Sequence, residues 1–432
     1  MNRKSLFITV LLAAGFITAA SAQHVVYVTG STAFRATVFT AATATSDIFD
    51  APATVLPTGA GSGSGNIIYK GNIGGVAYEL VCGWSGSEAG IANVAGKTSL
   101  ANVKVPKNWN GYAGQTTGGT GPTDPFQNMP GVPYTFLDPA GNGTTFEATP
   151  RTADLAFADT SRAGSLTPDP SLTHEYGQVA VVTFAWDKGY ESTPDSSWNN
   201  LHNVTLPELQ YAVASAVSAS FFTGDSADGD AVLLIGRNKG SGTHQNTFID
   251  VGTYPAPSSQ WAAYSSYQGT SPNLQLKFTG SPHASVAAAI TANSSDQPGN
   301  TPSGDGFDSG SGVAGNMGLD WANTGYVALG YMGVSDALGA EANGAVRLTL
   351  NGVSYSVGAV TLGLYPYFGY EHIYGQPSPS GDANTVESHL ASGINTYLVG
   401  VFNAADTTAG GIALSEMVAN RPGFSDFGYP TQ

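Results

Sequence analysis

The chain has 432 residues, which is enough for a large core and for two or three domains. It carries 15 Lys and Arg against 31 Asp and Glu, and the formal charge is −16, so a nucleic-acid or anionic-lipid partner is not expected. Gly (56) and Pro (24) are abundant, but 41% of the residues are hydrophobic, which is typical of a loop-rich globular protein and excludes a disordered one.

The N-terminus has the three-part layout of a secretory signal peptide. A short basic stretch, MNRK, precedes the apolar run LFITVLLAAGFITAA and the small residues ASA before Gln23. The run is short for a membrane span, and no Cys follows it to carry a lipid anchor. We expect residues 1–22 to be removed and the protein to be periplasmic or secreted.

Cys82 is the single cysteine, so an intrachain disulfide is excluded. It lies in the apolar run YELVCGW and is predicted to be a small buried hydrophobe. The seven His residues show no paired metal-ligand spacing, and no GxSxG nucleophile elbow is present. No metal, cofactor or catalytic residue is therefore predicted.

Apolar runs alternate along the chain with segments that have helix-start signals. Strands are expected within 24–30, 76–84, 152–161, 177–186, 230–237, 323–333 and 358–375, and helices within 31–49, 85–96, 206–222, 242–252 and 383–404. Ser31 or Thr32 is expected to cap the first of these helices. The alternation predicts an α/β protein with largely parallel sheets. The polar runs 57–75, 96–150, 252–282 and 291–320 are predicted loops, and 96–150 is long enough to be an insertion.

Small hydroxyl residues and a few charges follow several of the predicted strands. Ser31 and Thr32 follow the first strand, Ser85 and Ser87 the second, and Asp159 the third. RNKGSGT follows a later strand and contributes Arg237, Lys239, Ser241, Gly242 and Thr243. Open α/β sheets bind ligands at the carboxyl ends of their strands, where helix N-termini favour anions.

Asp159 suits such a site only if the anion carries a proton. A carboxylate can accept the P–OH of hydrogen phosphate, whereas sulfate has no proton to offer at neutral pH. Each of these pieces has a simpler reading: a Gly-Ser-Gly-Thr turn is common before helices, Ser87 could be only a cap, and Asp159 could brace a turn. His244, near the start of the helix expected over 242–252, is expected to lie on the surface.

In this order, TGSTAF, GSEAG, ADLAFADTS and RNKGSGT resemble the periplasmic phosphate-binding proteins that serve phosphate ABC transporters. The resemblance extends over about two thirds of the mature chain. It implies an α/β, two-lobed type 2 periplasmic-binding-protein fold with a ligand cleft between the lobes, a monomer, and ABC transporter membrane subunits as partners. The ligand implied is inorganic phosphate or a similar oxyanion, held by Thr32, the backbone N–H of Phe34, Ser87, Asp159, Arg237, Ser241, Gly242 and Thr243.

One departure from the family pattern concerns the ligand. The acid that usually stands two residues after the arginine, and orients it, is Lys239 here. Either Lys239 points to solvent, or the site takes a different oxyanion.

The resemblance places lobe I at 23–186 plus 365–432 and lobe II at 187–364, with hinges near VVTFAWD and GLYPYFG. Two alternatives stay open: a fold-related surface or structural protein with an altered or lost ligand, and a secreted phosphatase.

Overall fold

The computed structural model describes residues 24–56, 60–84, 86–96, 133–137, 143–147, 152–165, 174–213, 217–237, 240–253, 307, 309–402, 411–422 and 429–431. The predicted signal peptide, Ser85, Lys239 and the predicted loop 252–282 beyond Thr253 lie outside them.

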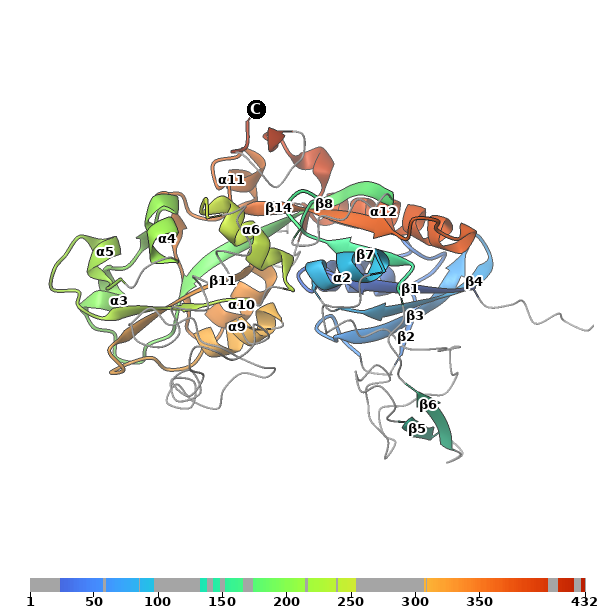
Figure 1. Ribbon diagram of the computed structural model, residues 1–432, viewed down its shortest axis with the longest axis horizontal. Helices are drawn as coiled ribbons and strands as arrows, with labels where there is room; N and C mark the ends of the chain where they lie inside the picture. Colours follow the sequence, from blue (N-terminus) through green and yellow to red (C-terminus); the bar gives the residue numbers. More distant parts are fainter. Residues whose placement is uncertain are drawn as a thin grey trace, which may run out of the picture.

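The predicted two-lobed α/β architecture is confirmed. Figure 1 shows two groups of strands and helices joined through β8 (His174–Lys188) and β14 (Phe368–Gly375).

The two lobes share one mixed sheet that is divided between them. In lobe I the strand order continues from β8 and β14 to β7 (Leu155–Ala158), β1 (His24–Gly30), β4 (Val76–Gly83), β3 (Asn66–Ile73) and β2 (Thr54–Leu56). In lobe II it continues from β8 to β11 (Tyr326–Gly333) and β10 (Ala231–Ile235), with β12 (Val346–Arg347) also beside this end of β8. β15 (Gly411–Ile412) pairs with Val181 and Val182, in the lobe I part of β8. Two-stranded sheets are formed by β9 (Asn203–Val204) with β13 (Thr349–Leu350), and by β5 (Pro133–Leu137) with β6 (Gly143–Glu147) in the 96–150 segment.

Strand β8 changes partners in its middle. Thr183 is paired with Phe368 of β14, whereas the next residue, Phe184, is paired with Gly333 of β11. The Phe184 N–H also donates to the carbonyl of Tyr367 at 3.1 Å. One strand therefore belongs to both lobes at the segment VVTFAWD, and the lobe boundaries and hinges placed there stay a prediction.

The prediction of largely parallel sheets was wrong. β1 runs parallel to β4 and β7, and β10 runs parallel to β11. The pairs β14–β7, β14–β8, β11–β8 and β3–β4 are antiparallel. At the junction the reason is the connection between the lobes, because strands that cross in opposite directions pair with each other. β3 and β4 are antiparallel because they form a hairpin around Gly74 and Gly75.

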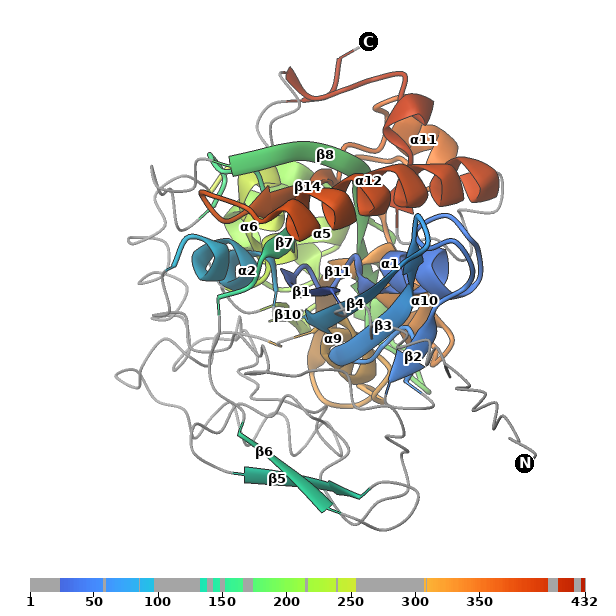
Figure 2. The ribbon, with the colours of Figure 1, turned by 90° about the vertical axis from the view of Figure 1, so that its right-hand side faces the viewer.

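Helices cover both faces of the lobe I sheet. In lobe I, α1 (Arg35–Thr43) packs on α12 (Gly381–Val401), which contacts β1 and β8, and α2 (Ser87–Val94) packs on β7 and β1. Figure 2 shows α12 lying along β8 and β14. In lobe II, α9 (Gly310–Met317) and α10 (Val334–Glu341) pack together beside β11, and α6 (Gly242–Asp250) contacts β11 and β14. The remaining helices are α3 (Ser196–Asn200), α4 (Leu206–Ala212), α5 (Ser220–Thr223), α11 (Val357–Thr361) and a 3₁₀ turn (Leu414–Glu416).

Several expected elements differ in extent. The helix expected over 206–222 starts with a capping box between Thr205 and Glu208, but it separates into α4 and α5. The strand expected over 358–375 begins as helix α11, because Ser356 caps it through the Ala359 N–H. The predicted loops 57–75 and 291–320 contain β3 and α9. The N-cap of α1 is Phe34, with no side-chain cap bond, so neither Ser31 nor Thr32 caps it.

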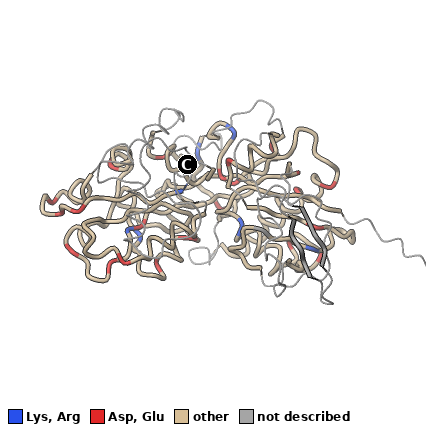
Figure 3. The backbone as a smooth tube through the Cα atoms, turned by 60° about the horizontal axis from the view of Figure 1, so that its bottom comes forward, with Lys and Arg blue, Asp and Glu red and all other residues tan. Residues whose placement is uncertain are grey.

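The charge and burial patterns agree with the composition. Figure 3 shows acidic positions on both lobes and few basic ones. Cys82 is a free thiol with only 1% of its surface exposed, as predicted, and burial raises its pKa. Within the described part of the chain, no helix has both the length and the apolar character needed to cross a membrane.

The end of β1 depends on a glycine. Gly30 has φ +111°, and a Cβ there would lie 1.9 Å from the carbonyl oxygen of Phe157. Gly177 has a similar φ of +130° but no atom within 4 Å of such a Cβ. We predict that Gly30→Ala lowers the free energy of unfolding by roughly 3 kcal/mol or more, against roughly 1–2 kcal/mol for Gly177→Ala. Urea denaturation of both variants measures this, and equal losses would contradict the steric argument.

Candidate functional site

The loops that follow four strands meet at the junction of the lobes. The Ser31 N–H donates to the Phe157 carbonyl at 2.8 Å, which joins the ends of β1 and β7. The Glu88 N–H donates to the Gly240 carbonyl at 3.1 Å, which joins the start of α2 to the turn after β10. We call the residues gathered here the anion site: Thr32, Ser87, Asp159, Arg237, Ser241, Gly242 and Thr243.

Asp159 lies at the centre of the anion site and is 1% exposed. The Ser87 hydroxyl donates to its Oδ1, and the Thr243 hydroxyl donates to its Oδ2 at 3.3 Å. A Cβ on Gly242 would come within 1.7 Å of Oδ1, so only glycine fits between the carboxylate and the start of α6. Burial raises the pKa of Asp159, while the bond from Ser87 and the charge of Arg237 act in the opposite direction.

Arg237 supplies the positive charge of the site and is also 1% exposed. Its Nη2 donates to Thr32 Oγ1 at 2.9 Å, and its Nε donates to the Phe307 carbonyl at 3.1 Å. Arg237 follows β10 in lobe II, whereas Thr32 follows β1 in lobe I. One guanidinium therefore connects both lobes at the place where their strand ends meet.

Three helices start around the site. α6 begins at Gly242, after Ser241 accepts the His244 N–H at 3.4 Å. α2 begins at Ser87, and α1 begins after Phe34; neither has a side-chain cap bond. Helix N-termini offer unpaired N–H groups and a partial positive charge. An anion placed among them would be bound by hydroxyls, backbone N–H groups and a guanidinium.

The structure brings together seven of the nine predicted site residues. Of the other two, Phe34 is fully buried, and its ring lies 5.8 Å from that of Phe157, so its side chain belongs to the core. The proposed role of its backbone N–H stays a prediction. Lys239 lies outside the described residues.

The sequence analysis missed charged residues at the site, among them Arg35 and Asp336. The Asp336 carboxylate lies over the start of α9, where a Cβ on Gly310 would be 1.9 Å from its Oδ2. Burial raises the pKa of Asp336, and the charges of Arg35 and Arg237 lower it. Asp336 is thus a shared counter-charge for two arginines, one from each lobe. The sequence could have indicated Asp336, because this residue comes shortly after the strand end YMG, just as the other site residues come shortly after the ends of their strands.

His244 was expected on the surface, and this was wrong. It is 3% exposed, and its Nδ1 lies 2.5 Å from the Arg237 carbonyl oxygen and 2.9 Å from the Tyr331 hydroxyl. Burial lowers its pKa to about 3, so it is neutral at physiological pH. Because α6 packs against β11, a residue in its first turn faces the core. His244 helps to hold the Arg237 backbone and is not placed to act as a base.

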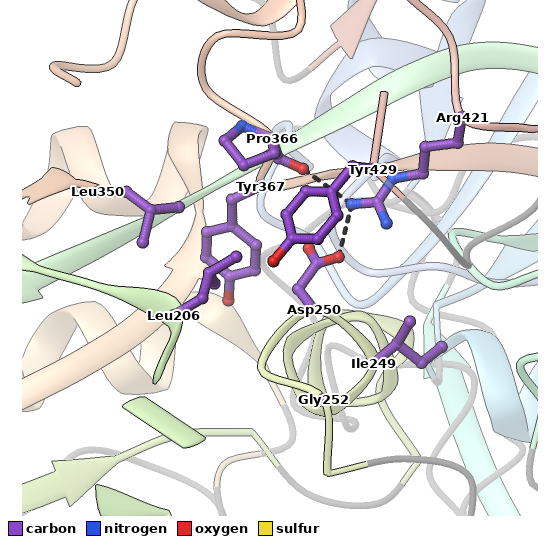
Figure 4. Close-up of a pocket in the computed structure, with 9 residues that line it drawn as sticks. All are labelled: Leu206, Ile249, Asp250, Gly252, Leu350, Pro366, Tyr367, Arg421 and Tyr429. Atoms are coloured by element: carbon purple, nitrogen blue, oxygen red, sulfur yellow. Dashed lines mark hydrogen bonds and ion pairs between the residues drawn. The ribbon is translucent and has the colours of Figure 1, made fainter. Parts of the chain in front are cut away.

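A cavity of about 160 Å³ lies near the opposite end of α6. Figure 4 shows its lining, in which Arg421 from the C-terminal segment forms an ion pair with Asp250 at 2.6 Å. Arg421 also donates to the carbonyls of Pro366 and Phe368 at 2.8 and 2.9 Å. The segment that crosses between the lobes is thus tied to the C-terminus of α6, while the N-terminus of α6 borders the anion site.

Among the described residues, no group of three or more His, Cys, Asp or Glu side chains could hold a metal ion. The polar chemistry of the junction is therefore that of hydroxyls, carboxylates and arginines. This combination suits reversible recognition of a small oxyanion.

Asp336→Asn tests the shared counter-charge. We predict a loss of roughly 1–3 kcal/mol in unfolding free energy, because two partly desolvated guanidinium groups lose a compensating charge. Asp225→Asn, in an exposed loop of lobe II, is the matched control and should change stability little. Denaturant unfolding at low and high salt measures both variants, and an Asp336→Asn protein as stable as the control would refute the electrostatic role.

No protein-family model and no curated protein matches the sequence. Among solved structures, the chain is similar to a putative phosphate ABC transporter substrate-binding protein with bound phosphate from Clostridium perfringens, at 12% identity and a TM-score of 0.43 over 90% of this chain and 100% of that one. It is also similar to PstS from Borrelia burgdorferi, at 12% identity and a TM-score of 0.37, over 90% of this chain and 98% of that one. A phosphate-binding protein from Stenotrophomonas maltophilia matches at 12% identity and a TM-score of 0.35, over 78% and 84% of the two chains.

Proposed function

We propose that this protein binds phosphate, or a similar small oxyanion, reversibly in the anion site between its lobes and delivers it to the membrane subunits of an ABC transporter. The observation that carries the proposal is the burial of Arg237 between the two lobes. Its buried guanidinium connects the two lobes among hydroxyls and helix N-termini, next to a carboxylate. A buried arginine in that setting is suited to bind an oxyanion through paired N–H donors.

Asp159 defines which oxyanion is favoured. Its carboxylate lies beside Ser87 and Thr243, where a bound anion would place its oxygens. An anion that carries a proton can donate a hydrogen bond to the carboxylate. An anion without a proton is repelled by the negative charge of the carboxylate. This favours hydrogen phosphate over sulfate.

The two-lobed arrangement supports a binding cycle that needs no chemistry. Thr32, Ser87 and Asp159 come from lobe I, and Arg237 and the start of α6 come from lobe II. A ligand that contacts both sets stabilises the closed form over the open one. Together with the predicted signal peptide, this fits a monomeric binding protein in the periplasm or outside the cell.

The two alternatives make different predictions about the same site. A secreted phosphatase would release phosphate from p-nitrophenyl phosphate, and its activity would be lost with Ser87→Ala. A fold-related structural protein without a ligand would show no saturable binding of any oxyanion. Burial lowers the pKa of His244 to about 3, so this histidine is too weak a base to serve a hydrolase well.

Calorimetric titration of the mature protein, stripped of ligand by unfolding and refolding, tests the proposal. We predict saturable binding of phosphate and none of sulfate. Asp159→Asn should weaken phosphate binding by roughly 10- to 100-fold and admit sulfate, because an amide can donate a hydrogen bond to an unprotonated oxygen. Arg237→Lys should weaken the binding of every oxyanion, because the planar fork of donors is lost.

Asp225→Asn serves as the control and should bind phosphate as the wild type does. Binding of sulfate by the wild-type protein would reject the acceptor role of Asp159. The absence of heat and of any ligand-induced rise in melting temperature with either anion would reject the binding function itself.

A further inference from the structure

A second carboxyl group, that of Glu371, is buried beside Asp159. In the antiparallel pairing of β7 with β14, Ala158 is opposite His372. The next step in that register places Asp159 opposite Glu371, just beyond the end of the ladder. Residues opposite each other in such a pair point to the same side of the sheet, with their Cβ atoms about 5 Å apart.

Other contacts agree with this placement. A Cβ on Gly369, two residues before Glu371, would lie 2.9 Å from the Asp159 carbonyl oxygen. β7 lies between β14 and β1 in the sheet, and Ser31 directly follows β1. Ser31 lies near enough to influence the pKa of Glu371, but without the geometry of a hydrogen bond.

Glu371 is completely buried, and both of its carboxyl oxygens lack a hydrogen-bond partner. The neighbouring His372 is bonded at 2.7 Å to Glu175. An ionised carboxylate in that position would be desolvated, unpaired and next to a like charge. Asp159, in contrast, has hydroxyl donors and the charge of Arg237. Of the two acids, Glu371 is the one that keeps its proton.

We propose that Asp159 and Glu371 form a carboxyl pair that together holds one proton beside the anion site, carried by Glu371 and called here the shared proton, and that oxyanion affinity depends on retention of that proton. The pair then contributes one negative charge at neutral pH. Loss of the proton to solvent at alkaline pH adds a second negative charge next to the bound anion. The affinity part of this inference rests on the proposed function, whereas the shared proton does not.

The titratable groups around Glu371 give the direction of the pH effect. Burial raises its pKa well above the ordinary value, and the charge of Asp159 raises it further. Because the folded protein holds this proton after the unfolded chain has released it, stability falls as the pH rises above the ordinary glutamate pKa and until it passes the folded pKa. Replacement by Gln keeps the shape of the neutral acid and removes this dependence.

Infrared difference spectroscopy of the ligand-free mature protein tests the shared proton. We predict that the spectrum of wild type minus that of Glu371→Gln shows, at neutral pH, the carbonyl stretch of a protonated carboxylic acid, and that wild type minus the matched control Glu416→Gln does not. Burial also raises the pKa of Asp187 to about 8, so only the band that differs between these proteins reports on Glu371. Absence of that difference band overturns the pair. If Glu371→Gln does not fold, the carboxylic-acid band of an Asp187→Asn protein decides: it must persist at neutral pH and disappear only at alkaline pH.

The affinity part is tested by phosphate titration of wild type and Glu371→Gln at several values from about pH 6 to about pH 10. Because the protonation of phosphate itself is the same in both titrations, the ratio of the two dissociation constants isolates Glu371. We predict a ratio near one at the acid end and a weakening of wild type by on the order of tenfold at the alkaline end. A ratio that does not change with pH, while the infrared band titrates, overturns the link to affinity. Lack of phosphate binding by wild type refutes the proposed function and leaves the infrared result to decide the pair.

Discussion

The burial of Arg237 between the lobes is the constraint on which the site depends. A guanidinium stays charged at any physiological pH, so burying it requires hydrogen-bond acceptors and opposite charges close by. Thr32 and the Phe307 carbonyl supply the acceptors, and Asp159 and Asp336 supply the charges. These partners come from both lobes, which makes the junction between the lobes polar.

The helix α6 links this polar junction to the segment that crosses between the lobes. At its N-terminus, Ser241 and Thr243 border the anion site, and Thr247 is bonded to the Tyr367 hydroxyl at 2.6 Å. At its C-terminus, Asp250 is paired with Arg421. A change at either end of this nine-residue helix acts on the same crossing segment. If the proposed ligand binds there, this helix connects its contacts to the relative position of the lobes.

The protonation of the acids at the site depends on their burial as well as on the residue type. Asp159, Asp336 and Glu371 are acids whose pKa values burial raises, and they differ in what opposes that effect. Asp159 has hydroxyl donors and an arginine, Asp336 has two arginines, and Glu371 has only a nearby serine. In the proposals made above, three carboxyl groups therefore have three different roles within one junction: a proton acceptor, a counter-ion and a neutral acid.

The sequence alone determined the α/β class, the positions of seven strands, and seven residues that the structure gathers into one site, because strand ends with small hydroxyl residues follow local patterns. It determined neither the antiparallel pairing at the junction nor the split of 358–375 into α11 and β14, because those depend on which distant segment lies alongside. Arg35, Asp336 and Glu371 become part of the site only through tertiary structure, as does the burial of His244. Their proximity to Arg237 and Asp159 comes from the packing of two lobes, and no spacing along the chain encodes that distance.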